Sequence, residues 1–418
     1  MRVPLLPAFA LALLSACPAG AAELWTYRGT IGKSPVILEV TQALADGRIE
    51  GRYAYLSRGI DIPLHSTADD TASFVVKEEA PCKPGLCQSA GSGDQDPPPP
   101  IAAEWRVQYE DEADRITGTW KDLKTGKTLP VTLSFTGTRL LDNDPTVGYD
   151  LVVDYLPPEK TAEDFPYEFE KMKGPFAAGE VQELDGGSYR VDEDKRIGIG
   201  YPVIESLAGG GDTGPINDWL TARRIALSVP DYACASRRYQ SFQWDEQSGI
   251  GDDYQSESSA RLDFLSDRLV GVSEGGSFFC GGAHPDNFSR YQLGDVATGK
   301  SVAPESLLKD FTFQDYNGQP LDPARATEDN PGRYVPSEAL IARVTRDWKP
   351  DGRVTDSGCE MPQLIHDNLS VAFKGSDLVF VLKDLPNYAA ACGDDLYAIP
   401  LSEAGDLLNR KGKRYFSE

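Results

Sequence analysis

The chain has 418 residues, 40% of them apolar, with a net charge of −24 and a mean hydropathy of −0.37. This length predicts two or three domains with real hydrophobic cores. The acidic balance excludes nucleic acid as a partner, because phosphate binding needs clustered Lys and Arg, and it disfavours an anionic membrane surface. Beyond the N-terminus, no stretch approaches the ~20 apolar residues that a membrane span needs.

The first 22 residues have the pattern of an export signal. A positive charge and an apolar run are followed by small residues at 19–22, which suit cleavage. We therefore expect residues 1–22 to be a signal peptide and the mature, periplasmic protein to begin near Glu23. The alternative is a lipoprotein anchored at Cys17, but Pro18 directly after that cysteine favours the cleaved form.

The cysteines are interpreted in the light of export. The chain has 7 cysteines, of which Cys17 belongs to the signal segment, so an even number remains. In an oxidising compartment this favours disulfides over metal ligation or redox catalysis, and we expect no metal and no cofactor. Proximity suggests a Cys82–Cys87 bridge around a short turn. The pairing of Cys234, Cys280, Cys359 and Cys392 stays open at this point.

Residues 23–140 predict a β-rich domain. Short segments with alternating apolar residues, rich in aromatic and β-branched types, are separated by Gly, Asp and Lys turns. The sequence also repeats itself: Ile49 matches Ile116 and Pro63 matches Pro130, each at an offset of 67 residues. Two similar β-meander halves would explain the repeat and would bury both aromatic faces, so we expect one small barrel or curved sheet.

Two polar segments interrupt the chain. Residues 81–100 are rich in Pro and Gly without an apolar period, and they predict a surface loop. Residues 141–185 are rich in Pro and acidic residues, and they predict a linker with some short structure.

Residues 186–418 predict an α+β domain with helices packed on an antiparallel sheet. Helical spacing of apolar residues appears in 211–229 and again in 336–348, where Ser337 is a suitable N-cap. Hairpin patterns occupy 260–279 and 368–382. The whole chain is therefore expected to be α+β, with an all-β domain first.

The second half also resembles a known family. The motif residues are Cys280-Gly-Gly-Ala-His284-Pro, the turn Ala297–Lys300 and the segment Leu385–Cys392. Over residues 186–418 the chain resembles the extracytoplasmic domain of RsiV-type lysozyme-sensing anti-sigma factors, which also occurs in PdaC-type peptidoglycan deacetylases and in envelope proteins of unknown function. The chain shows no sigma-binding segment, anchoring helix or deacetylase domain. The resemblance therefore implies a fold and an envelope location rather than an activity.

The resemblance implies the remaining disulfides. With Cys234 expected just after the first helix and Cys359 and Cys392 on either side of the last hairpin, the implied pairs are Cys234–Cys280 and Cys359–Cys392. Each would stabilise the fold by roughly 2–4 kcal/mol.

The residues after Cys280 are then expected to form a tight structural corner. The glycines Gly281 and Gly282 permit positive φ, Ala283 allows close approach, and the ring nitrogens of His284 can satisfy loop carbonyls. A zinc site would need three or four ligands, and the other histidines, His65 and His366, belong to unrelated segments.

Two functions are compatible with the sequence. The first is a non-catalytic binding or sensing module for cell-wall material or a basic protein, with lysozyme as the first candidate. The alternative is a cell-wall-directed hydrolase that uses carboxylates, and whether the protein is an enzyme is left open. No catalytic residue is identified, because no nucleophile elbow appears and sequence spacing does not show whether two acids converge.

Overall fold

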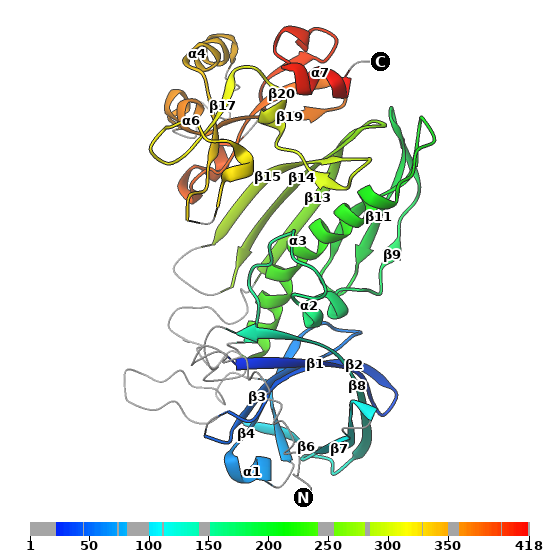
Figure 1. The fold of residues 1–418 in the computed structure, drawn as a ribbon. Helices are drawn as coiled ribbons and strands as arrows, with labels where there is room; N and C mark the ends of the chain where they lie inside the picture. Colours follow the sequence, from blue (N-terminus) through cyan, green and yellow to red (C-terminus); the bar gives the residue numbers. More distant parts are fainter. Residues whose placement is uncertain are drawn as a thin grey trace, which may run out of the picture.

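The computed structural model describes residues 22–416, apart from 45, 73–74, 82–99, 111–112, 142–150, 241–254, 281–284, 328, 350–358 and 394. The chain is a mixed α+β protein with more strand than helix: an eight-stranded antiparallel barrel comes first, and smaller sheets with a few helices follow. Figure 1 shows the barrel at one end, helices α2 and α3 against it, and the C-terminal elements at the other end. The predicted fold class is confirmed.

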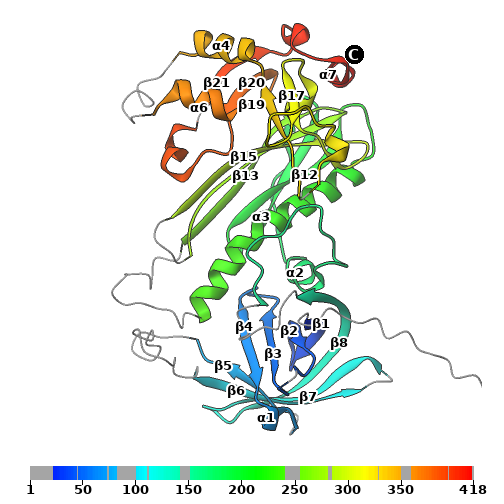
Figure 2. The ribbon, with the colours of Figure 1, turned by 60° about the vertical axis from the view of Figure 1, so that its left-hand side comes forward.

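The barrel closes because β1 pairs with both β2 and β8. Its rounded wall is seen from another side in Figure 2. A five-residue helix, α1 (Ala68–Ala72), connects the fourth strand of the barrel to the fifth. The strands are β1 (Ala22–Ile31), β2 (Ser34–Thr41), β3 (Ile49–Tyr55), β4 (Asp61–Ser66), β5 (Val75–Glu79), β6 (Ile101–Glu110), β7 (Arg115–Asp122) and β8 (Thr128–Leu141).

The sequence repeat falls on equivalent strands of this barrel. At the offset of 67 residues, β3 and β4 correspond to β7 and β8. The two equivalent turns each contain a glycine with positive φ, 72° at Gly59 and 71° at Gly126. Only glycine adopts this conformation without steric cost, which explains why both turns carry it. The inner face is filled by apolar and aromatic side chains, among them Tyr27, Tyr53 and Trp105.

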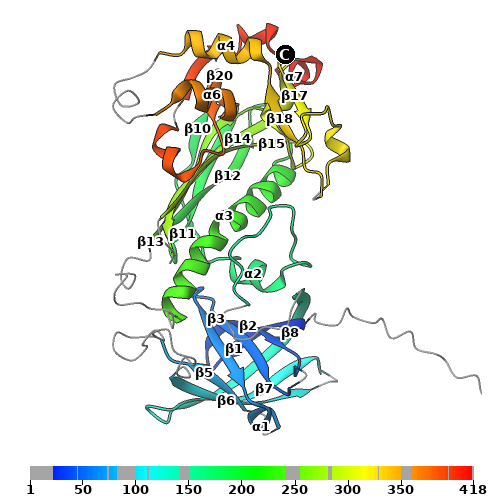
Figure 3. The same cartoon turned by 90° about the vertical axis from the view of Figure 1, so that its left-hand side faces the viewer.

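The middle of the molecule contains the long helix α3 (Gly214–Gln240), which Figure 3 shows running from the sheets down to the barrel. The short helix α2 (Pro166–Lys171) also packs on the barrel. The nearby sheets consist of β9 (Ala177–Ala178), β10 (Gln182–Leu184), β11 (Gly187–Asp194), β12 (Ile199–Leu207), β13 (Gln255–Leu265), β14 (Leu269–Phe279), β15 (Asp286–Asp295) and β16 (Lys300–Ser301).

Helix α3 is longer than the sequence predicted. It continues past Val229 through Pro230, so Cys234 lies inside the helix and not just after it, and that expectation was wrong. A proline inside a helix removes one backbone hydrogen bond and crowds the carbonyl four residues earlier, at a cost of about 3 kcal/mol. Buried contacts of Val229, Tyr232 and Cys234 continue on both sides of Pro230, and this packing outweighs the local penalty.

The C-terminal part forms its own large apolar core, with Leu307, Val344, Phe373 and Phe380 among its buried members. Ser337 caps α4 as predicted, because its Oγ accepts a hydrogen bond from the backbone N–H of Leu340. The elements here are β17 (Phe311–Gln314), β18 (Arg333–Pro336), α4 (Glu338–Asp347), α6 (Met361–Asn368), β19 (Leu369–Lys374), β20 (Asp377–Leu382), β21 (Asp395–Pro400) and α7 (Arg410–Phe416), with short 3-10 turns between them. Within the described residues, no helix is both long enough and apolar enough to cross a membrane.

Candidate functional site

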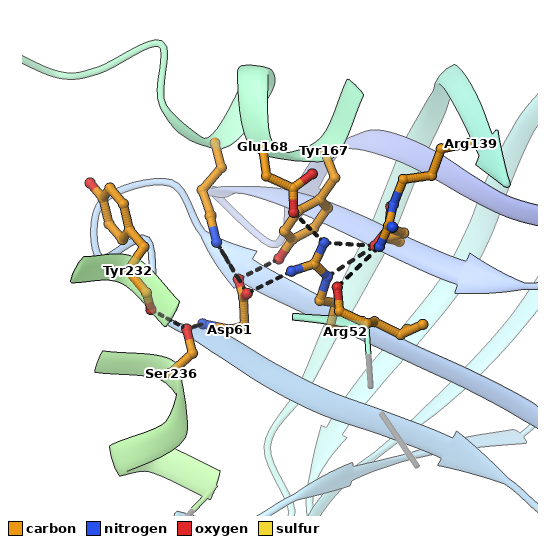
Figure 4. A network of polar contacts seen from close by, with 10 residues as sticks. Arg52, Asp61, Arg139, Tyr167, Glu168, Tyr232 and Ser236 are labelled. Atoms are coloured by element: carbon orange, nitrogen blue, oxygen red, sulfur yellow. Dashed lines mark hydrogen bonds and ion pairs between the residues drawn. The ribbon is translucent and has the colours of Figure 1, made fainter. Parts of the chain in front are cut away.

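The most extensive buried polar site lies where the outer wall of the barrel meets α2 and α3. Its centre is Arg52 on β3, a fully buried side chain whose guanidinium reaches three carboxylates (Figure 4). Arg52 donates to Glu39 on β2 at 2.8 and 2.9 Å and to Asp61 on β4 at 3.0 Å. It also donates to Glu168 on α2, and its Cζ lies 4.1 Å from the ring centre of Tyr167.

Glu39 is shared between two guanidinium groups. Arg139 on β8 donates to Glu39 from Nε at 2.7 Å and from Nη2 at 3.0 Å, and it also donates to the backbone oxygen of Leu151. Burial alone would raise the pKa of Glu39, but Arg139 and Arg52 together lower it to about 2. The carboxylate is therefore ionised at any pH near neutrality.

Asp61 connects the barrel to both helices. Its carboxylate accepts hydrogen bonds from Lys171 Nζ at 2.9 and 3.1 Å and from the Tyr167 hydroxyl at 2.8 Å, both on α2. Its backbone N–H donates to Ser236 Oγ on α3 at 2.9 Å, and that hydroxyl donates in turn to the Tyr232 carbonyl. Burial, with Asp61 beside it, raises the pKa of Tyr167 well above its usual value, so the phenol remains a donor.

We call the six charged residues of this site the junction network: Glu39, Arg52, Asp61, Arg139, Glu168 and Lys171. Its three cations and three carboxylates balance, and all six side chains are almost completely buried. Such a network has no exposed group to offer a substrate. Removing one member would leave an uncompensated buried charge, so the network holds the barrel and the helices in a single arrangement.

A second cluster, on β3–β5, contains a buried carboxyl group, Glu50, whose pKa is raised. Glu50 on β3 is only 4% exposed and is the cross-strand partner of His65 on β4. Burial raises the pKa of Glu50 to about 7, although His65 and Arg48 oppose the shift. His65 Nδ1 lies 3.3 Å from Glu79 Oε1, and Arg48 Nη1 lies 3.0 Å from Glu50 Oε1. Two acids and an imidazole therefore converge on one side of the barrel.

Two further buried acids lie between α3 and the β13–β15 sheet. Glu274 on β14 accepts from Arg223 at 2.6 and 3.1 Å and from the Tyr201 hydroxyl at 2.6 Å, so its charge is fully paired. Asp231 on α3 is different: it is 3% exposed, no cation in the described part of the chain is paired with it, and a contact with the Ser258 side chain opposes only part of the effect of its burial. Burial raises the pKa of Asp231 to about 6.

The structure contains the two disulfides that the resemblance implied. Cys234 on α3 is bonded to Cys280 at the end of β14, and Cys359 is bonded to Cys392. The first bridge ties α3 to the sheet beside it. The second joins the segment before α6 to the turn after β20. Both confirm the predicted pairing.

Other predicted site residues lie outside the described part of the chain. These are the suggested Cys82–Cys87 bridge and the corner formed by Gly281, Gly282, Ala283 and His284. Both stay predictions. The remaining histidines are not brought together, because His65 lies on β4 of the barrel and His366 on α6 of the C-terminal part. Among the described residues, no group of three or more His, Cys, Asp or Glu side chains is placed to hold a metal ion.

Sequence reasoning did not find the junction network. Glu39, Arg52 and Asp61 occupy strand positions whose neighbours point into the barrel, so alternation assigns them to solvent. The one available signal was the concentration of charges of both signs on successive strands. What buries them, α2 and the end of α3, comes more than 100 residues later in the chain.

No family model matches the chain, and no curated protein matches it. Two solved structures of DUF3298 family proteins are similar to it. The protein from Bacteroides fragilis has 12% identity and a TM-score of 0.33, and the one from Pseudomonas aeruginosa has 12% identity and a TM-score of 0.24. Each match covers 57% of this chain and 94% of the other. Likeness at this level transfers no site, ligand or activity.

Proposed function

We propose that this protein is an exported component of the bacterial cell envelope that binds a basic protein without catalysing a reaction. A lysozyme-like wall enzyme is the first candidate partner. The N-terminal pattern of a signal peptide and the two disulfides support an oxidising, extracytoplasmic location. We also propose the domain division that the sequence suggests. A β-rich domain comprises residues 23–140, a connecting segment comprises 141–185, and an α+β domain comprises 186–418.

One observation carries the choice of a basic partner. The junction network sums to zero charge, so the chain's net charge of −24 lies on side chains outside it. Acidic surface attracts a cationic partner over a distance of about 8–10 Å at moderate salt and speeds the encounter.

Calorimetry with purified lysozyme tests the proposal. Binding at low salt that weakens at moderate salt is expected, because surface charges are screened. No binding at low salt would remove lysozyme as the partner, and binding that ignores salt would remove the electrostatic argument. Intact mass of the mature protein tests export: a chain beginning near Glu23 is expected, whereas lipidated Cys17 would support the anchored form.

A carboxylate-dependent cell-wall hydrolase is the second candidate, and one observation favours it. Glu50, with a pKa of about 7, is suited to donate a proton at neutral pH, and Glu79 lies beside His65 in the same cluster. Against it, Glu50 is almost completely buried. Release of soluble fragments from peptidoglycan by the wild type, abolished in Glu50→Gln with the fold intact, would establish this function in place of the first.

A further inference from the structure

One end of the barrel carries a cluster of aromatic side chains, which we call the aromatic cluster: Trp25 and Tyr27 on β1, Tyr109 on β6 and Phe135 on β8. Trp25 lies 6.0 Å from Tyr109 and 6.4 Å from Phe135, and Tyr27 lies 5.8 Å from Phe135, between ring centres. Tyr109 is 42% exposed and Phe135 is 37% exposed, whereas Tyr27 is 1% exposed and belongs to the barrel core, against which Trp25 packs. Partly exposed rings that contact one another on a closed barrel are a common feature of binding surfaces.

The strand pairing explains how these rings meet. Between β1 and β8, Thr26 pairs with Gly137 and Tyr27 pairs with Phe135, so one extra residue of β8 forms a bulge. A bulge bends the strand and changes the direction of its side chains, and bulges are frequent at barrel rims. Here it places Phe135 opposite Tyr27 and within contact of Trp25.

Asp114 holds two of the rings in place. Its carboxylate accepts a hydrogen bond from the Tyr109 hydroxyl at 2.7 Å, and its backbone carbonyl accepts one from the N–H of Phe135 at 3.0 Å. Asp114 also has a φ of 47°, an uncommon conformation for a residue other than glycine. Such conformations persist where the surroundings hold the residue, and they are frequent at ligand sites.

The charge of Asp114 has no cation beside it in the described structure. The nearest basic residue along the chain, Arg115, is already bonded to Glu110 at 2.7 Å. Asp114 is exposed, and it is close enough to Tyr27 to contribute, after burial and Tyr109, to raising the pKa of that phenol. Within the described residues, the aromatic cluster therefore has a negative charge at its edge with no basic side chain paired to it.

We infer that the aromatic cluster and Asp114 form a binding site for a lysine or arginine side chain of a protein partner. A cation over the face of Trp or Tyr is attracted by the ring, and a carboxylate beside the rings adds direct charge attraction. This site gives a location to the basic partner, and in that respect it rests on the proposed function.

The ring orientations favour a cation over a sugar. The planes of Trp25 and Tyr109 are inclined at 57°, those of Trp25 and Phe135 at 77°, and those of Tyr27 and Phe135 at 71°. Rings inclined in this way present faces in different directions, as the walls of an aromatic cage do, rather than one flat surface for a sugar ring to stack on. The acidic edge favours the same choice.

The test is calorimetry of the full mature chain with three probes at low salt: a blocked peptide of lysines, the same peptide with glutamates, and a chitin tetrasaccharide. The wild type is expected to bind the lysine peptide only. Tyr109→Ala and Asp114→Asn should each weaken that binding about 2- to 30-fold, the range that cation–π and charge contacts cover. Tyr109→Phe, which keeps the ring, should retain more affinity than Tyr109→Ala.

The matched control is Tyr388→Ala, which removes a tyrosine that is 89% exposed in the C-terminal half and should leave binding unchanged. Circular dichroism and urea unfolding establish that each variant is folded. If Tyr109→Ala or Asp114→Asn does not fold, Phe135→Leu is tested in its place, because it removes a ring of the cluster but retains the backbone hydrogen bond to Asp114. Equal affinity of wild type and the cluster variants for the lysine peptide would overturn the site. If the wild type binds only the tetrasaccharide, or none of the three probes, the inference that the site binds a basic side chain is wrong.

Repeating the titrations with lysozyme separates the two proposals. If lysozyme binds wild type and the cluster variants equally, the proposed function stands and this site is wrong. If the lysine peptide binds through the cluster but lysozyme does not bind, the site stands and the choice of lysozyme is wrong.

Discussion

Replacing Arg52 with methionine tests how the barrel is held to the helices. The substitution keeps most of the apolar volume but removes the donor shared by Glu39, Asp61 and Glu168. Glu39 would keep Arg139, and Asp61 would keep Lys171 and Tyr167. Among the described residues Glu168 would keep no hydrogen-bond partner, since its other oxygen is already buried without one. The network would then carry one uncompensated negative charge.

The expected loss is about 3–5 kcal/mol of unfolding free energy, the usual cost of breaking a buried ion pair from one side. Arg139, and after it Arg52, lower the pKa of Glu39 from 4.5 to about 2 against the effect of burial, so the ionised carboxylate contributes to the stability of the folded state. Because the pKa is depressed in the folded state, this stabilisation is present above about pH 4.5 and is lost as the pH falls toward 2.

Urea unfolding at pH 7 measures the effect, with Arg28→Met as the matched control. Arg28 also joins the barrel to α2, through Glu170 at 2.9 Å, but its side chain is half exposed, so a loss of at most about 1 kcal/mol is expected. The double variant Arg52→Met, Glu168→Gln removes the unpaired charge and should recover about 1–3 kcal/mol. Equal losses for Arg52→Met and Arg28→Met, or no recovery in the double variant, would refute this account of the junction.

Three other outcomes are expected. Burial raises the pKa of Glu50 to about 7, so the folded state holds that proton more tightly than the unfolded state, and the unfolding free energy should fall as the pH rises from about 4.5 to 7. In urea unfolding at a series of pH values, Glu50→Gln should remove about 1–3 kcal/mol of this fall, and an unchanged dependence of the unfolding free energy on pH would contradict the assignment. Asp231→Asn should raise the melting temperature at pH 8, where the buried carboxylate is ionised, but not at pH 4; a lower value at pH 8 would show that the contact with Ser258 outweighs the cost of burying the charge. Replacing Cys359 and Cys392 with alanine should lower stability by about 2–4 kcal/mol, and a non-reduced digest of the wild type should yield the peptide that links them.

The barrel was predictable because its signals are local. Alternation marks most of the strands, though not β4 or β5, and the repeat aligns Gly59 with Gly126, whose positive φ angles differ by only one degree. Capping by Ser337 was predictable for the same reason, since the cap and its helix are adjacent in sequence.

The junction network and the full length of α3 were not predictable in this way. Arg52 looks like an exposed strand residue until α2 and α3 cover it, and only tertiary contacts decide that outcome. Pro230 looks like the end of a helix, but packing on both sides of it continues the helix. The disulfides depended on a resemblance, because spacing alone does not choose among the possible pairings of six cysteines.

The ionic character of the junction has a consequence for the order of folding. The barrel strands are synthesised first, and their outer wall remains uncovered until α2 and α3 follow. If this outer wall were apolar, it would be prone to aggregate before α2 and α3 pack on it, as exposed hydrophobic surface in folding intermediates generally is. A wall that presents Glu39, Arg52 and Asp61 stays hydrated during that interval and becomes dehydrated only when its partners arrive. We therefore expect the early barrel to remain monomeric, with the loss of water at this surface delayed to the last step of assembly.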